Sequence, residues 1–223
     1  MPLPPSNHER EPIHTRRVTC QGYRRADGLW DIEGHLRDTK SYGFDNHERG
    51  MINPGDPIHD MWLRLTLDDT MTVKDAVAIT EASPYGLCPS ITPRYGSLIG
   101  LRIGPGWTRK TRQLFGGING CTHLTELLGP IATTAFQTIY PYLARQQQKP
   151  REGAAQPENR ETSETGEAKG ESQSGPKQKP PVLLNTCHAF AAHSPVVKRQ
   201  WPAFYQEQAP GSAASSDDAI RQD

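Results

Sequence analysis

The 223-residue sequence has no long apolar run. Its apolar stretches stay far below the roughly 18–20 residues that a membrane-spanning helix requires, so we expect no membrane segment. The N-terminus reads MPLPPS and lacks the basic stretch and apolar core of a secretory signal. These absences predict a cytoplasmic protein, in which cysteines act as thiols, metal ligands or catalytic groups rather than as disulfides.

The chain also lacks a net charge, because 25 Lys and Arg residues balance 25 Asp and Glu residues. A protein that binds nucleic acid in general carries a basic surplus that neutralises phosphates. The composition therefore predicts no nucleic-acid partner, and it leaves a protein partner open.

Apolar residues are scarce as well, at 34% of the chain, whereas about 45–50% is usual when glycine is also counted. The deficit is local, because residues 144–181 contain no Leu, Ile, Val, Met, Phe, Tyr, Trp or Cys. Such a segment buries too little apolar surface to offset its ordering entropy. We therefore predict a flexible N-terminus (1–14), a domain (15–143), a disordered linker (144–181), a C-terminal island that packs on the domain (182–205) and a disordered tail (206–223).

Within the domain, strands come first and helices follow. Alternating residues predict one hairpin from strands 17–24 and 29–37 and a second from strands 61–67 and 72–81, with a loop over 38–57. Helical spacing occurs at 91–101, 107–115 and 121–143, and Pro130 is expected to kink or split the last helix. This order predicts an α+β domain in which an antiparallel sheet of hairpins carries C-terminal helices on one face.

Cysteine and histidine gather at the boundaries of these predicted elements. Cys121 and His123 open the long helix, Cys88 lies in the loop after the second hairpin, and His59-Asp60 stands at the entrance of that hairpin. A helix N-terminus favours a thiolate, which makes Cys121 the best candidate for a ligating sulfur. Thiolate, imidazole and carboxylate together suit zinc, iron or an iron–sulfur cluster, whereas the absence of any CxxC pair excludes zinc-finger spacing. The predicted metal ligands are His59, Asp60, Cys88, Cys121 and His123.

Two other functions fit the same residues. In an enzyme, Cys121 would be the thiolate nucleophile, His123 or His59 the base, and Asp60 the group that orients the base. In a non-catalytic interaction module, the linker and the tail would recruit a partner protein.

The remaining cysteines and histidines carry weaker signals. Cys187 and His188 lie in the C-terminal island, where we expect them to fold over the site as a cofactor-binding lid. Cys20 lies in the middle of a strand and is expected to be ordinary core. The histidines without a partner pattern are expected to be solvated, namely His8, His14, His35, His47 and His193.

Three stretches of the domain are long and distinctive. They are residues 22–40 (GYRRADGLWDIEGHLRDTK), 57–66 (PIHDMWLRLT) and 120–128 (GCTHLTELL). They resemble a bacterial family of domains of unknown function, number 2889, and residues 185–189 (NTCHA) are similar to that family's tail. The resemblance implies an uncharacterised bacterial protein and does not by itself imply an activity.

A second resemblance concerns the order of elements and ligands. U-type iron–sulfur scaffold and SufE-like domains place antiparallel strands before helices, with a Cys-x-Asp before a strand, a cysteine after the next strand and a last cysteine at a helix start. His59-Asp60, Cys88 and Cys121 occupy the matching positions, although a histidine stands at the first one and His123 follows the last cysteine. This resemblance implies a SufE/NifU-like fold, and with only two thiolates it leaves open a scaffold cluster, a cluster shared with a partner or a mononuclear metal.

Overall fold

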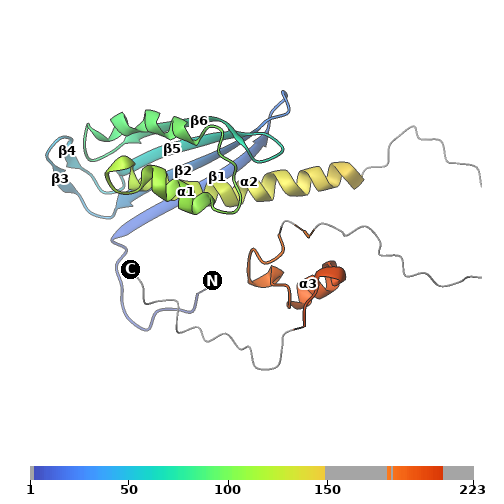
Figure 1. Ribbon diagram of the computed structural model, residues 1–223. Coiled ribbons are helices and arrows are strands. Elements are labelled where there is room, and N and C mark those ends of the chain that lie inside the picture. Colours follow the sequence, from blue (N-terminus) through green and yellow to red (C-terminus); the bar gives the residue numbers. More distant parts are fainter. Residues whose placement is uncertain (1–2, 149–179, 182, 208–223) are drawn as a thin grey trace, which may run out of the picture. The chain divides into compact units, whose positions relative to one another are not determined.

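The computed structural model describes residues 3–148, 180–181 and 183–207 (Figure 1). The chain divides into two units, Met1–Ala155 and Gln156–Asp223, which are described separately below. Most of the predicted linker (149–179) and most of the predicted tail (208–223) lie outside the described residues. None of the helices in the described part combines the length and apolarity needed to cross a membrane.

The first unit is built on a four-stranded antiparallel sheet. Its strands are β1 (His14–Arg24), β2 (Trp30–Lys40), β5 (Pro57–Leu67) and β6 (Val73–Ala82), in the order β1-β2-β5-β6. The two hairpins predicted from alternation are therefore confirmed, and each of the two pairs forms one half of the sheet. β2 pairs with β5 and joins the halves.

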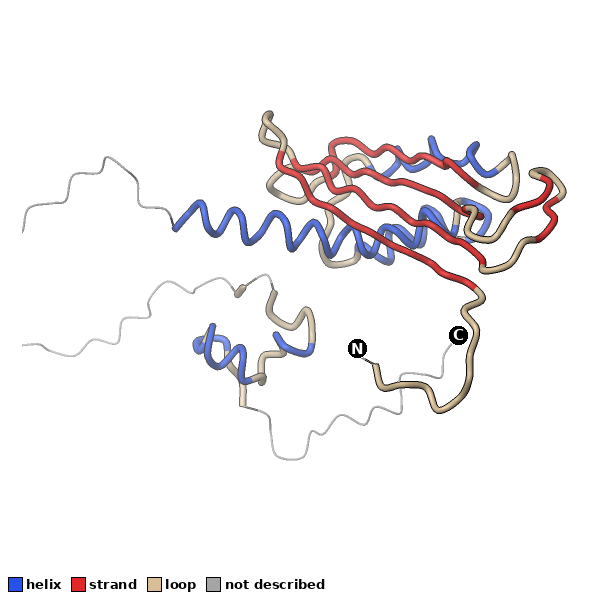
Figure 2. The backbone as a smooth tube through the Cα atoms, turned by 180° about the vertical axis from the view of Figure 1, so that it is seen from behind, coloured by secondary structure: helices blue, strands red, loops and turns tan. Residues whose placement is uncertain are grey.

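The predicted loop over 38–57 is wrong in several places. β2 continues to Lys40, β5 already starts at Pro57, and the residues between form a small ribbon of β3 (Phe44–Asn46) and β4 (Gly50–Ile52). Figure 2 shows this ribbon projecting from one end of the sheet. The prediction failed because strands of three residues are too short to show a period, and because a charged residue at position 38 looks like the end of an apolar strand.

One face of the sheet carries the helices and the core. Side chains from alternate positions of β2 and β5 point to this face and are fully buried, among them Ile32, Leu36, Leu63 and Leu65. They form a single core cluster with buried residues of the three main helical segments. The predicted α+β class, with an antiparallel sheet and helices on one face, is confirmed.

Two glycines let the longest helix, α2 (Thr122–Gln148), lie directly on the sheet. A Cβ added to Gly22 would stand 2.0 Å from Oγ1 of Thr138, and one added to Gly34 would stand 2.8 Å from Ile131. Any side chain at either position would therefore push α2 away from β1 and β2.

The other helices differ in how well they follow the sequence pattern. α1 (Trp107–Phe115) has the predicted bounds. The segment predicted as a helix over 91–101 is instead a 3₁₀ helix, η1 (Cys88–Leu98), and a short 3₁₀ turn, η2 (Gly117–Asn119), follows α1. Pro89 and Pro93 explain the difference, because neither can donate the backbone hydrogen bond that an α-helix requires.

α2 runs without interruption through Pro130 and Pro141, so of the two expectations at Pro130 the split is wrong and the kink stays a prediction. Pro130 is exposed and its ring faces away from the sheet. The opposite side of the helix is buried along its length, through Leu124, Leu127, Ile131 and other residues of the core cluster. This burial outweighs the local cost of the missing hydrogen bond.

The second unit contains η3 (His188–Phe190), α3 (Pro195–Gln200) and η4 (Pro202–Phe204). The Ser194 side chain caps α3 by accepting a hydrogen bond from the backbone N–H of Val197. The rings of Phe190 and Trp201 pack 5.3 Å apart between their centroids. This island therefore has ordered local structure of its own.

Candidate functional site

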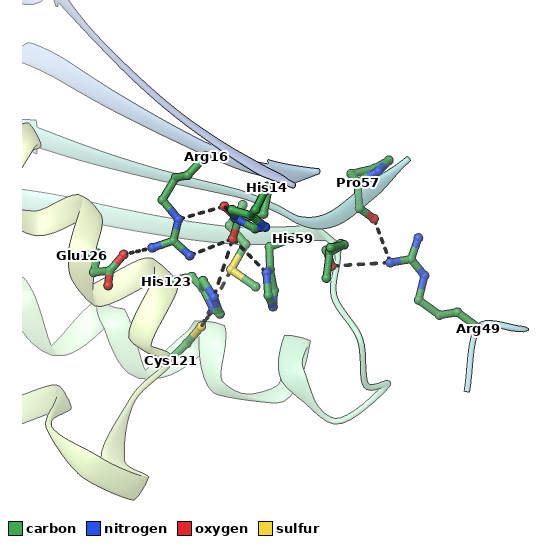
Figure 3. A network of polar contacts seen from close by, with 11 residues as sticks. His14, Arg16, Arg49, Pro57, His59, Cys121, His123 and Glu126 are labelled. Atoms are coloured by element: carbon green, nitrogen blue, oxygen red, sulfur yellow. Dashed lines mark hydrogen bonds and ion pairs between the residues drawn. The ribbon is translucent and has the colours of Figure 1, made fainter. Parts of the chain in front are cut away.

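The candidate site lies at the end of the sheet where β1 begins, β2 ends, β5 begins and α2 starts (Figure 3). The antiparallel register brings these segments together, because Arg16 pairs with Asp38 and Asp38 pairs with His59. The period of two along β2 turns Asp38 to the same face as the buried Leu36, toward α2. Residues far apart in the chain thus meet under the first turn of α2.

Asp38 is the centre of this group and is only 1% exposed. Nε and Nη2 of Arg16 donate to its two oxygens, each at 2.8 Å. Nε2 of His14 lies 3.2 Å from Oδ1, and Nδ1 of His59 lies 3.0 Å from Oδ2. Burial acts to raise the pKa of Asp38, but the Arg16 and His59 contacts prevail and lower it to about 2. The carboxyl group is therefore ionised, and both oxygens have two partners.

Arg16 also connects the sheet to the helix. Its Nη1 donates to the carboxylate of Glu126, which lies on the first part of α2. The same guanidinium thus holds Asp38 of β2 and Glu126 of α2. It fixes the distance between the two elements that supply the site.

Two histidines are stacked beside the carboxylate. The rings of His59 and His123 lie 3.6 Å apart between their centroids at an interplanar angle of 28°. Nε2 of His123 is 3.8 Å from Oδ2 of Asp38. Burial lowers the pKa of both histidines; the neighbouring His123 adds to this for His59, and Arg16 adds to it for His123. Both rings are therefore neutral at pH 7 and able to act as ligands.

Two sulfur atoms complete the group on the side of α2. The Cys121 Sγ lies 3.8 Å from Nδ1 of His123 and 3.8 Å from Sδ of Met61. The Tyr95 hydroxyl donates to the backbone oxygen of Cys121 and accepts from its N–H and from Oγ1 of Thr125. These bonds hold the backbone of Cys121 at the entrance of α2.

The structure brings together some predicted site residues and separates others. His59, Cys121 and His123 lie in the group, whereas Asp60 points to the opposite face of the sheet because adjacent strand residues alternate. Cys88 begins η1 and is half-buried. Among the residues that the structure describes, the group of acidic, histidine or cysteine side chains close enough to share a metal is Asp38, His59 and His123, whose ligand atoms lie within 4.8 Å of one another.

Two histidines expected to be solvated have partners instead. Nε2 of His35 lies 2.6 Å from Oδ1 of Asp60, and its ring stacks on Trp62 at 3.9 Å. His14 contacts Asp38. The prediction was wrong for the half-buried His35, because cross-strand neighbours cannot be identified before the register is known, whereas His14 is exposed as expected although it contacts Asp38. Cys20, by contrast, packs against the core as expected, and burial raises the pKa of its thiol.

Cys187 is exposed and His188 begins η3, both in the second unit. That they cover the site stays a prediction.

Arg16, Asp38 and the sulfur of Met61 also belong to the site, although residue types and spacing did not predict them. Asp38 continues the inward-facing positions Ile32, Gly34 and Leu36 of β2. Extending the period of two by one step would have placed it on the core face.

A family model described as "Protein of unknown function (DUF2889)" matches residues 14–137 of the chain. The chain belongs to DUF2889. The DUF2889 match starts at the first residue of β1 and includes every residue of the candidate site. No curated protein and no solved structure matches the chain. The SufE/NifU-like fold thus stays a prediction beyond the confirmed α+β class.

Proposed function

We propose that the protein binds one transition-metal ion through His59, His123 and Cys121, with Asp38 as the outer carboxylate. The observation that carries the proposal is the convergence of two neutral imidazoles on a buried carboxylate, with a free thiol beside one of them. Imidazole and thiolate are the ligands that zinc and iron sites use most.

Asp38 fits an outer role better than a ligand role. Its two oxygens already accept four contacts, which fills the lone pairs of a carboxylate. A metal-bound histidine usually has its second ring nitrogen bonded to such a carboxylate, which fixes the tautomer and the orientation of the ring. Asp38 does this for His59 through Nδ1, and this leaves Nε2 of His59 for the metal.

The separation of the donors supports a single ion. A tetrahedral site with sulfur at about 2.3 Å and nitrogen at about 2.0 Å places these two ligands about 3.5 Å apart. The observed distance between Cys121 Sγ and His123 Nδ1 is 3.8 Å. With one thiol, in contact with His123, this geometry favours a mononuclear ion over an iron–sulfur cluster. A reducing compartment such as the cytoplasm would keep that thiol free.

Metal analysis of anaerobically purified protein tests the proposal. We expect close to one equivalent of metal per chain, from purification or after reconstitution, and loss of binding in Cys121→Ser and His123→Asn. Cys88→Ser and Asp60→Asn are the matched controls and should retain the metal. Wild-type protein that takes up no metal, or site variants that bind as well as wild type, would refute the proposal.

A second candidate is a thiol-dependent enzyme. It is favoured by the position of the His123 ring between the Cys121 thiol and the Asp38 carboxylate. Nδ1 of His123 faces the thiol and Nε2 faces the carboxylate, each at 3.8 Å. Asp38 thus occupies the orienting role that the sequence analysis gave to Asp60. In this case the metal-free protein reacts with iodoacetamide at Cys121, and His123→Asn slows that reaction. The comparison uses a Cys187→Ser background, because Cys187 is exposed.

A further inference from the structure

Met61 adds a fourth donor to the proposed site. Its thioether sulfur lies 3.8 Å from Cys121 Sγ, and its side chain is only 1% exposed. His59 and Met61 stand two residues apart on β5, so the alternation of the strand turns both to the helix-bearing face. Cys121 and His123 come from the start of α2. Two pairs of residues therefore face each other across the gap between β5 and α2.

We propose that the metal is copper, bound by His59, Cys121 and His123 with the Met61 thioether as a weaker fourth ligand. This inference rests on the proposed function and names the ion. Two imidazoles and one thiolate with a weakly bound axial methionine form the ligand set of mononuclear copper–thiolate sites. A thioether is a soft ligand of the kind that Cu⁺ selects, and a His₂Cys site with an axial methionine is typical of copper.

The distances agree with this donor set. Two sulfurs that each lie about 2.3 Å from a tetrahedral metal are about 3.8 Å apart, and a longer bond to the weaker thioether increases this separation. The observed separation of 3.8 Å between Cys121 and Met61 is at the lower end of that range. The burial of Met61 also prevents water from taking the fourth position, and it places a soft donor there. Cys121 and Met61 thus supply the sulfur donors and His59 and His123 the imidazole donors. Asp38 contacts the imidazoles and is not a ligand itself.

Competition with a chromophoric Cu⁺ chelator under anaerobic conditions tests this proposal. Tight binding of Cu²⁺ alone would not be diagnostic, because most nitrogen and sulfur sites prefer Cu²⁺ among divalent ions. We expect the full-length protein to take Cu⁺ from bicinchoninate. Met61→Leu should weaken Cu⁺ binding by at least about tenfold, the smallest usual cost of losing even an outer-shell partner. The affinity of the same variant for Zn²⁺ should be unchanged.

Met71→Leu is the matched control. Met71 is also buried and belongs to the same core cluster, but it lies in the turn beyond the other end of β5. Exchange between Met and Leu conserves volume and is well tolerated in cores, and thermal unfolding of both apo variants verifies their folding. In addition, the Cu²⁺ form should show the intense visible absorption of a copper–thiolate bond, which Cys121→Ser abolishes.

The outcomes separate the two proposals. If wild-type protein binds Zn²⁺ at this site but does not compete for Cu⁺, or if Met61→Leu binds Cu⁺ as tightly as wild type, the copper assignment is wrong and the metal site stands. If the protein binds neither ion, both proposals fail.

Discussion

At the scale of single residues, Asp38 makes more of the polar contacts that hold the site together than any other side chain. It combines almost complete burial with full ionisation; the Arg16 guanidinium compensates its charge, and two imidazoles contact its oxygens. A buried carboxylate with such partners is costly to disturb, because removal of its charge leaves Arg16 without its main counter-ion. Its role is therefore as much structural as it is functional.

Asp38→Asn is expected to destabilise the protein by about 2 kcal/mol at neutral pH, since each pKa unit corresponds to about 1.4 kcal/mol. The folded pKa of Asp38 is about 2, below its ordinary value of 3.8. The stabilisation is complete above the unfolded pKa and is lost as the pH falls through the folded one. Urea unfolding of wild type and variant at several pH values measures this difference, which should shrink below pH ~4. Asp45→Asn, at an exposed position, should have little effect.

The histidine pair titrates in a higher pH range than Asp38. On acidification the two imidazoles gain a positive charge, whereas Asp38 loses its negative charge. Because the folded pKa values of His59 and His123 are lowered, the unfolded chain binds protons first as the pH falls. Stability of the metal-free protein should therefore decrease on acidification through the usual range of histidine, near pH 6.5. His123→Gln should flatten this part of the unfolding profile, and His47→Gln, an exposed control, should not. Equal slopes in all three proteins would contradict the burial-driven shift.

At the scale of elements, the sequence pattern predicted long segments well and short or interrupted ones poorly. The four strands of the sheet and α1 follow directly from periods of two and 3.6 residues. The β3–β4 ribbon and the 3₁₀ form of η1 did not follow, because three-residue strands show no period and prolines interrupt the helical one. His59, Cys121 and His123 were found from residue type and position, whereas Arg16, Asp38 and Met61 required the register and the packing of α2.

The uninterrupted course of α2 leads to a prediction about Pro130. Pro130→Ala restores a backbone hydrogen bond at an exposed position and should raise the free energy of unfolding by about 1–3 kcal/mol. Pro141→Ala lies nearer the exposed end of the helix, where ends fray, and should give a smaller gain. Chemical denaturation of the two variants beside wild type compares the effects. A destabilised Pro130→Ala would show that the ring makes contacts that the alanine cannot replace.

At the scale of the whole molecule, the core and the candidate site belong to the first unit. Every residue of the main core cluster falls between Trp30 and Ile139. Within the stretch that follows, the described side chains of residues 144–146 and 180–181 are not part of that cluster. The polarity of the complete chain therefore says little about the domain that carries the site.

A fragment of residues 1–148 should fold with the same denaturation midpoint as the full chain, because it contains the entire main core. Its metal affinity tests the expected lid. If Cys187 and His188 cover the site, the fragment binds metal more weakly, and Cys187→Ser with His188→Ala in the full chain reproduces the loss. A fragment that unfolds at lower denaturant would contradict the independence of the first unit.

The order of the strands has a consequence for how the protein folds. β1 pairs with β2, β2 with β5 and β5 with β6, so the sheet is a meander whose pairings are all between strands close in the sequence. Pairings between neighbouring strands require little loop closure, so we expect them to form early in folding. Asp38, His59 and Met61 would then be positioned by the sheet before α2 brings Cys121 and His123 to it. The proposed metal ion needs ligands from both β5 and α2, so we expect it to bind after α2 has docked and not to guide the assembly of the sheet.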